Sequence, residues 1–406
     1  MKIVGLITEY NPFHNGHLYH IHESLRITGA DAALVVMSGD YVQRGTPAIM
    51  PKRLRTEMAL YCGAGAVLEL PVCYATGSAE FFALGAISLL DSLGIVDSVC
   101  FGSECSDLPL LQKIAGLLVD EPEQYREILR HELKLGKSFP AARQTAVVFC
   151  TGDPRCADIL KDPNNILGIE YLKALKKCGS SIRPYTIRRK GAGYHSSQLD
   201  GLYSSASAIR SLLAYSSSSI HTEFAGDDST ELSFSDILNE LGNQVPKKCL
   251  ELLSDFHKIQ YPVYQNDFSL ILKYKLLNKH PESLVRYMDV SPELAARICT
   301  SLNDFFNYKQ FAGLLKTKEL TQTRINRALL HIMLGIKKDS VSEYMNSGYN
   351  FYARLLGFRK DCSQILTEIS KKSSLPLLTK LAESRELCEL GQRMLRDDIL
   401  ESNLNT

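Results

Sequence analysis

The chain has 406 residues, 46 basic and 45 acidic side chains, and a formal net charge of +1. At roughly 100 to 200 residues per domain, this length favours two or three domains. The balanced charge excludes a general attraction to polyanions, so any nucleic-acid surface must come from local clusters of Lys and Arg.

Two further features bear on where the chain works. Its first apolar run, residues 2–7, is too short for a signal peptide or a membrane span and is expected to be a β-strand. The eleven cysteines include no C-x-x-C pair, which indicates neither a disulfide framework nor a zinc site. We therefore expect a cytoplasmic protein that makes no use of a membrane or a protein-bound metal.

Short β-branched runs alternate with helix-like stretches through the first 100 residues. This alternation is typical of parallel strands covered by helices. The sequence thus predicts an α/β fold with a Rossmann-like, doubly wound parallel sheet. Strands are expected at 2–7, 32–37, 66–72 and 96–101, and helices at 17–27, 51–62 and 79–93.

The segment after the first predicted strand carries the clearest chemical signal, Thr-Glu-Tyr-Asn-Pro-Phe-His-Asn-Gly-His at residues 8–17. Gly16 leaves room for a phosphate, and the helix expected near His17 turns free N–H groups and its positive dipole end toward that phosphate. His14 and His17 can donate hydrogen bonds as charge builds up at an α-phosphorus. Two histidines at a helix start are often plain polar loop residues, but the position directly after the first strand favours a nucleotide site.

The loop after the second predicted strand should lie at the same edge of the sheet, because ligands bind at the carboxyl ends of parallel strands. Gln43 and Arg44 in this loop are candidates to contact a carboxylate or a phosphate. An ordinary loop followed by a solvated helix start at Lys52, Arg53 and Arg55 explains the same residues. The residue types alone leave both interpretations open.

The remainder of the chain is predicted to continue the first domain and then to form a second. A helical insertion at about 107–145 precedes a helix at 165–177 and a strand at 182–188, and the first domain is expected to cover 1–215. The Ser-rich stretch 216–230 predicts a linker. Helical spacing of leucines predicts a mainly α-helical domain over 231–406, with a short strand signal at 269–272.

The first loop resembles the H-x-G-H nucleotidyltransferase superfamily, whereas Gly136-Lys137-Ser138 lacks the first glycine that a P-loop requires. The whole chain closely resembles the bacterial tRNA(Met) cytidine acetate ligase family. Matching segments are 8–17, 37–48, 68–71, 78–83, 101–104, 163–171, 193–195 and 205–210.

The resemblance implies an ATP site that includes Gly102, Asn165 and an arginine after the following strand, either Arg188 or Arg189. From the first loop it implies Ile7, Thr8, Glu9, Tyr10, Asn11, Pro12, Phe13, His14, Asn15, Gly16, His17 and His20. Residues 205–210 stand where related enzymes open a late helix that holds the β and γ phosphates, with Ser205 or Ser207 as its N-cap. His14, His17, Arg44 and Ser207 are the expected catalytic residues.

The resemblance also implies a reaction and a partner. Acetate would attack the α-phosphate of ATP, with Mg²⁺ on the phosphate oxygens, and the acetyl group would pass to the wobble cytidine of elongator tRNA(Met). Arg324 and Arg327, three residues apart on one predicted helix, are the expected RNA contacts, although charged helix faces are often merely solvated. The alternatives are a small-molecule adenylyltransferase and a noncatalytic nucleotide- or RNA-binding module.

Overall fold

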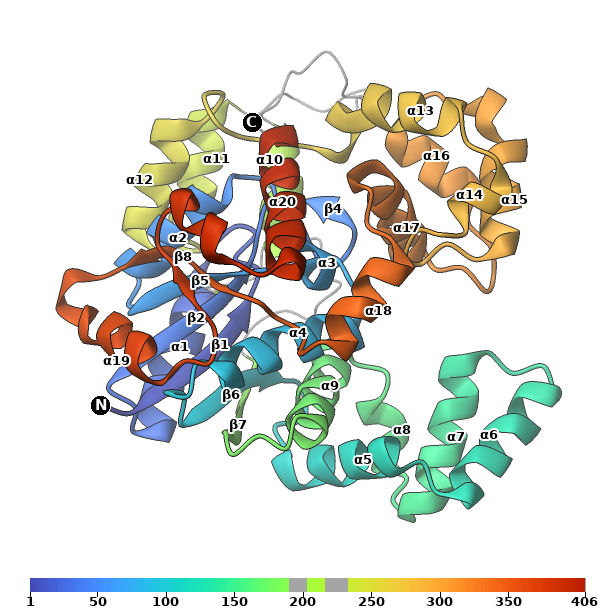
Figure 1. Cartoon of the computed structure of the whole chain (residues 1–406), viewed down its shortest axis with the longest axis horizontal. Coiled ribbons are helices and arrows are strands. Elements are labelled where there is room, and N and C mark those ends of the chain that lie inside the picture. The colour runs from blue at the N-terminus through green and yellow to red at the C-terminus, as the bar shows by residue number, and fades with distance from the viewer. Residues whose placement is uncertain (190–202, 216–232, 406) are drawn as a thin grey trace.

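The structure, a computed structural model, describes residues 1–189, 203–215 and 233–405. A seven-stranded sheet with the order β7-β6-β1-β2-β5-β8-β9 lies at its centre (Figure 1). The strands are β1 (Ile3–Thr8), β2 (Ala32–Ser38), β5 (Ala66–Leu70), β6 (Ser98–Ser103), β7 (Arg183–Arg188), β8 (Ala353–Phe358) and β9 (Leu377–Leu378). The strands β1, β2, β5, β6 and β7 run parallel, whereas β8 pairs antiparallel with β5. The predicted α/β fold is confirmed, with a sheet that is mostly rather than wholly parallel.

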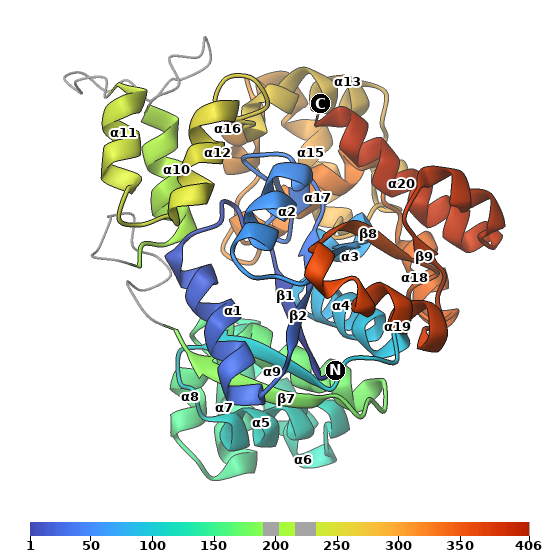
Figure 2. The ribbon, with the colours of Figure 1, turned by 90° about the vertical axis from the view of Figure 1, so that its left-hand side faces the viewer.

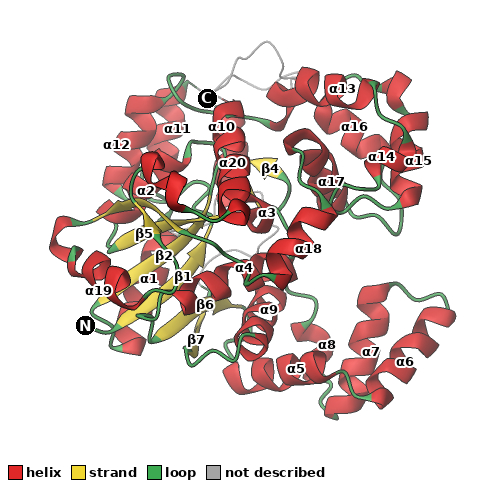
Figure 3. Ribbon diagram, in the orientation of Figure 1, coloured by secondary structure: helices red, strands yellow, loops and turns green. Residues whose placement is uncertain are grey.

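Helices cover both faces of this sheet (Figure 3). They include α1 (Asn15–Thr28), α2 (Lys52–Tyr61), α4 (Ala79–Ser92) and α9 (Pro163–Lys177). Successive residues of β1 point to opposite faces, as the pleat requires. Val4 and Leu6 belong to the hydrophobic cluster that contains residues of α1 and α2, whereas Ile3 belongs to the cluster that contains residues of α4 and α9. The strands and helices predicted for the first 100 residues are all found, with small shifts at their ends.

The expected helical insertion lies between β6 and α9 and extends somewhat beyond residue 145. It consists of α5 (Leu108–Asp120), α6 (Glu123–Lys134), α7 (Phe139–Thr151) and α8 (Arg155–Ile159). These helices lie beside α9, away from the group formed by α13, α14, α15, α16 and α17 (Figure 1). Within the described ranges, no helix has both the length and the apolar character needed to cross a membrane.

The described residues from 233 onward are mainly helical, as predicted. The α-helices are α11 (Phe234–Leu241), α12 (Lys247–Phe256), α13 (Ser269–Leu277), α14 (Pro281–Leu284), α15 (Pro292–Thr300), α16 (Tyr308–Leu314), α17 (Gln322–Leu334), α18 (Lys338–Asn346), α19 (Gln364–Lys372) and α20 (Glu389–Leu404). The strand expected at 269–272 is wrong, because Phe268, Leu272 and Leu276 are buried at helical spacing. The linker predicted at 216–230 and the matching segment 193–195 lie outside the described residues.

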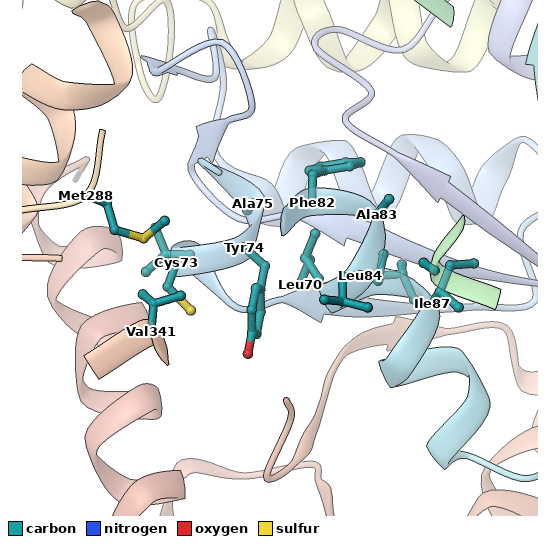
Figure 4. Packing of buried hydrophobic residues seen from close by; sticks show 14 of the residues in the cluster. Leu70, Cys73, Tyr74, Ala75, Phe82, Ala83, Leu84, Ile87, Met288 and Val341 are labelled. Atoms are coloured by element: carbon teal, nitrogen blue, oxygen red, sulfur yellow. The ribbon is translucent and has the colours of Figure 1, made fainter. Parts of the chain in front are cut away.

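The C-terminal helices pack directly on the elements that follow β5. The short helix α3 (Val72–Ala75) places Cys73 beside Met288 and Val341 (Figure 4). The hydroxyl of Tyr74 donates a hydrogen bond of 2.7 Å to the carbonyl of Tyr349. The β8–β9 pair then extends the sheet itself from residues close to the C-terminus. Elements from both ends of the chain therefore share one core.

Candidate active site

A pocket lies at the carboxyl ends of β1, β6 and β7, and the amino-terminal ends of α1 and α10 (Ala206–Tyr215) form part of its wall. Figure 2 shows α1 running beside β1 and β2. Most of the predicted site residues line the pocket: Ile7, Thr8, Glu9, Tyr10, Asn11, His14, Gly16, His17, His20, Arg44, Gly102, Arg189 and Ser207. The predicted residues that do not line it are Pro12, Phe13, Asn15, Asn165 and Arg188.

The backbone fixes the tautomers of the two motif histidines. His14 is the N-cap of α1, and its Nδ1 accepts a hydrogen bond of 3.0 Å from the N–H of Gly16. The Nδ1 of His17 accepts one of 3.3 Å from the N–H of His14. An accepting ring nitrogen carries no proton, so the proton of each neutral imidazole is on Nε2. Both rings therefore offer an N–H donor from the wall of the pocket.

Burial keeps these imidazoles neutral. It lowers the pKa of His14 to about 3, helped by the positive charges of Arg189 and Arg210. Burial also lowers the pKa of His17 well below its usual value, and His14 adds to this effect. The two rings stack with centroids 3.7 Å apart, an arrangement that two imidazolium ions would disfavour. Near neutral pH the free site thus presents two uncharged donors.

Gly16 has a more specific role than the sequence suggested. A Cβ atom at this position would lie 2.8 Å from Cε1 and 3.0 Å from Nδ1 of His14. The missing side chain therefore makes room for the imidazole that caps α1. The sequence predicts a glycine at position 16 to leave space for a phosphate. In the structure, the ring of His14 occupies the space beside Gly16.

The start of α10 closes the pocket from the other side. The Oγ of Ser205 accepts a hydrogen bond of 3.0 Å from the N–H of Ala208. Of the two N-caps predicted for this helix, Ser205 and Ser207, Ser205 is therefore the one that the structure confirms. Arg210 donates to the carbonyl of Asn11 at 2.6 Å and to the Oγ of Ser207 at 3.0 Å. Arg210 is the last residue of the matching segment 205–210 and is not among the predicted site residues. It instead lines the pocket and ties α10 to the first loop.

Near the ends of β6 and β7, two pairs of adjacent residues differ in whether they reach the pocket. Arg189 lines the pocket, donates to Oδ1 of Asn164 at 3.2 Å, and lies against Gly102, whereas Arg188 is not part of the wall. Asn165 is fully buried, and its Oδ1 accepts from the N–H groups of Glu104 and Cys105. The amide of Asn165 therefore shapes the turn after β6, and Asn164 is the residue of this pair that reaches the pocket.

The loop with Gln43 and Arg44 is a small hairpin, β3 (Tyr41–Val42) and β4 (Thr46–Pro47). The N–H of Gln43 donates to the carboxylate of Glu9 at 2.9 Å, which joins the hairpin to the first loop. At Gly45, φ is +74°, and a Cβ atom would collide with the backbone nitrogen of Arg327. Helix α17 therefore packs directly against the turn that presents Arg44.

A buried charged cluster supports this hairpin from behind. The ammonium group of Lys52 is bonded to Glu69, lies 3.2 Å from Glu401 on α20, and lies 3.5 Å from Asp40. Burial opposes the charge of Lys52, but the carboxylates outweigh it and raise the pKa of this group above its usual value. Glu401 in turn accepts a bond of 3.2 Å from the N–H of Asp40. Lys52 therefore has a structural role, and it is not part of a solvated helix start.

Arg55 is the second buried cation of this region. Its guanidinium is fully buried and donates to four backbone carbonyls, those of Glu9, Ser38, Gly39 and Met50. Glu9 follows β1, Ser38 and Gly39 lie at the end of β2, and Met50 lies just before α2. Arg55 thus joins the two loops that form one side of the pocket.

The two arginines expected to contact RNA differ in their surroundings. Arg327 is 9% exposed, and its Nε and Nη2 donate to Asp289 at 2.8 and 3.3 Å. Arg324 is partly exposed at the first turn of α17. The guanidinium of Arg327 is thus engaged inside the protein, and Arg324 is the residue of the pair that reaches the surface.

Comparison with known proteins places this site in a family. A family model described as HIGH Nucleotidyl Transferase matches residues 1–405. The tRNA(Met) cytidine acetate ligase of Caldanaerobacter subterraneus subsp. tengcongensis is 43% identical over 100% of this chain and 95% of its own length. The enzyme of the same name from Acetivibrio thermocellus is 40% identical over 100% and 94%.

Solved structures give the same result. The apo structure of Thermotoga maritima TmcAL superimposes with a TM-score of 0.90 at 32% identity, covering 100% of this chain and 94% of that one. The same protein bound with alpha-thio ATP gives a TM-score of 0.88 over the same shares. The chain therefore belongs to the HIGH nucleotidyl transferases and, among them, to the tRNA(Met) cytidine acetate ligase family.

Proposed function

We propose that this chain uses ATP to activate acetate as acetyl-adenylate and then acetylates the exocyclic amine of the wobble cytidine of elongator tRNA(Met). The observation that carries the proposal is the pair of neutral imidazoles, each with its proton on Nε2, at the amino-terminal end of α1. A relative of the same fold binds an ATP analogue, and the curated relatives are named for tRNA(Met), cytidine and acetate.

In the first step an acetate oxygen forms a bond to the α-phosphorus of ATP while the bond to the bridging oxygen of the β-phosphate breaks. Pyrophosphate leaves with the electron pair of that bond. His14 and His17 donate from Nε2 to α-phosphate oxygens, where negative charge increases, and the dipole of α1 acts in the same direction. Arg189 and Arg210 supply positive charge beside these imidazoles. Because the donors are uncharged and already held, they need little rearrangement.

In the second step the cytidine amine forms a bond to the acetyl carbon, AMP leaves, and the amine gives up a proton. This requires an unstacked base, which an anticodon loop offers and a duplex does not.

Mg²⁺ bound to the ATP phosphates would neutralise part of their charge. Among the described residues there is no group of three or more His, Cys, Asp or Glu side chains that could hold a metal ion. We assign Mg²⁺ to the nucleotide, whose phosphates carry the charge. We assign Arg324 to the RNA, because it is the partly exposed member of the Arg324/Arg327 pair.

Pyrophosphate exchange into ATP separates the candidate functions. We expect exchange that depends on acetate and is absent when acetate is omitted. Exchange that requires a phosphomonoester in place of acetate would support a small-molecule adenylyltransferase, and no exchange with any acid would support a noncatalytic module. Either of these results would contradict the proposal.

Replacing Gly45 by Ala is expected to lower the rate of acetate-dependent exchange at least about tenfold, because a misplacement of catalytic groups by about 1 Å has costs of this order or more. The added Cβ would lie 2.6 Å from the carbonyl carbon of Asn326 and push the hairpin with Arg44 away from the pocket. Gly136→Ala is the matched control, since Gly136 also has a positive φ, of +81°, but has nothing within 4 Å. Equal effects of the two substitutions would mean that the contact with α17 does not position the hairpin.

A further inference from the structure

Large apolar side chains are exposed along one face of α13. Leu270, Tyr274 and Leu277 are 82, 71 and 58% exposed, and their spacing of four and three residues places them on one side of the helix. Phe306, 68% exposed, lies in the turn before α16. The Nζ of Lys273 donates to the carbonyl of Phe305 at 3.2 Å, which holds this turn against α13.

The same surface is basic. Residues 269–281 contain Lys273, Lys275 and Lys279 and no acidic residue. Lys273 lies on the same face as the apolar side chains, three residues after Leu270 and four before Leu277, and Lys275 is exposed at the flank of the helix, so cations border the exposed apolar side chains. A second copy of this chain would bring Lys273 and Lys275 of α13 against their own copies, and the helix has no acidic residue to offset them, which disfavours self-association through this helix. Exposed rings interleaved with cations instead suit a single-stranded nucleic acid, in which bases stack on the rings and phosphates contact the cations.

The amino-terminal end of α13 lies next to the hairpin of the active site. The ring of Phe268, the residue before α13, lies 5.7 Å from the ring of Tyr41 in the β3 strand of the hairpin. The hairpin residues Val42 and Arg44 line the pocket. Helix α13 also packs against α17, which contacts the hairpin at β4. A nucleic acid with one base in the pocket would therefore have its neighbouring nucleotides near this helix.

We propose that Leu270, Tyr274, Leu277, Phe306 and Lys275, here called the α13 surface, bind unpaired nucleotides of the substrate tRNA by stacking and charge contact. The inference rests on the proposed function and adds a location for the RNA. The aromatic rings act on any base, because every base has a π-face, so the surface contributes affinity rather than base identity.

The test compares tRNA acetylation with acetate-dependent pyrophosphate exchange in variants of the full chain. Tyr274→Ala with Phe306→Ala is expected to raise the KM for tRNA at least about tenfold, since the double variant removes both rings on which bases would stack. Tyr274→Trp alone should keep the parent KM. Tyr61→Ala is the matched control, because Tyr61 is 58% exposed but lies on α2. Exchange and the thermal midpoint should stay at the parent values, which shows that the site and the fold are intact.

The outcomes separate the two proposals. A parent chain without acetate-dependent exchange contradicts the proposed function itself. Normal exchange together with an unchanged KM for tRNA in the double variant contradicts only the α13 surface. A parent chain that forms dimers, which the double variant converts to monomers without a change in KM, would assign the surface to self-association and would overturn the inference.

Discussion

Replacing His14 or His17 by Ala is expected to lower the rate of acetyl-adenylate formation at least about a hundredfold, the usual cost of removing one donor that stabilises transition-state charge. Each imidazole offers one Nε2 proton, because its Nδ1 accepts a backbone hydrogen bond. The measurement is acetate-dependent pyrophosphate exchange with purified variants. Exchange at the parent rate in both variants would remove these histidines from the mechanism.

The control for this prediction uses the second role of His14, which caps α1. His14→Ala should also lower the free energy of unfolding by about 0.5–2 kcal/mol, the range for losing an N-cap. His14→Asn restores a good capping side chain but is too short to replace the imidazole. We expect His14→Asn to recover most of the stability and little of the activity. Recovery of both would show that the alanine variant failed through its helix rather than through a lost donor.

Replacing Lys52 by Met is expected to lower the free energy of unfolding by about 3–5 kcal/mol, because it removes the ammonium group that pairs with the buried carboxylate of Glu401 and leaves Glu69 with Arg354 alone. Glu69 and Glu401 are each 1% exposed and both contact the Lys52 ammonium group. Chemical denaturation measures the loss. Arg53→Met is the control from the same helix, and its exposed side chain should matter by less than about 0.5 kcal/mol.

The contrary result is equally specific. Denaturation of Lys52→Met at the parent midpoint would mean that the carboxylates of this cluster take up protons at little cost. If Lys52→Met does not accumulate as folded protein, Glu401→Gln is measured in its place. This substitution should lower the free energy of unfolding by less, since the amide keeps an acceptor for the N–H of Asp40. Parent stability in that variant as well would show that the cluster does not hold the loop behind the hairpin.

Local patterns explain which parts of the fold were predictable. The strands of the first 100 residues carry period-two alternation or continuous apolar runs, and the H-x-G-H loop directly follows the first of them, so both were found. The strand predicted at Ser269–Leu272 was wrong because a short apolar segment fits a strand and a buried helix turn equally well. The antiparallel strand β8 was missed because its pairing partner, β5, lies far away in the sequence.

The same limit applies to the site. Which of Arg188 and Arg189 faces the pocket depends on the register at the end of β7, and which of Asn164 and Asn165 does so depends on how α9 is rotated. Neither the strand register nor the helix rotation can be predicted from the sequence where two identical residues are adjacent. The pairing of Lys52 with Glu401 joins residues 349 positions apart and leaves no local trace. Arg210 did have a signal, since it ends the segment 205–210 that the family resemblance places at the β and γ phosphates.

The products of the complete reaction test the central claim most directly. Purified protein is incubated with ATP, Mg²⁺, radiolabelled acetate and elongator tRNA(Met), with coenzyme A rigorously excluded. We predict label in acetylcytidine at the wobble position, with AMP and pyrophosphate formed in equal amounts to it. Formation of ADP and phosphate as the stoichiometric products, or a requirement for coenzyme A, would contradict attack at the α-phosphate and with it the account of the site.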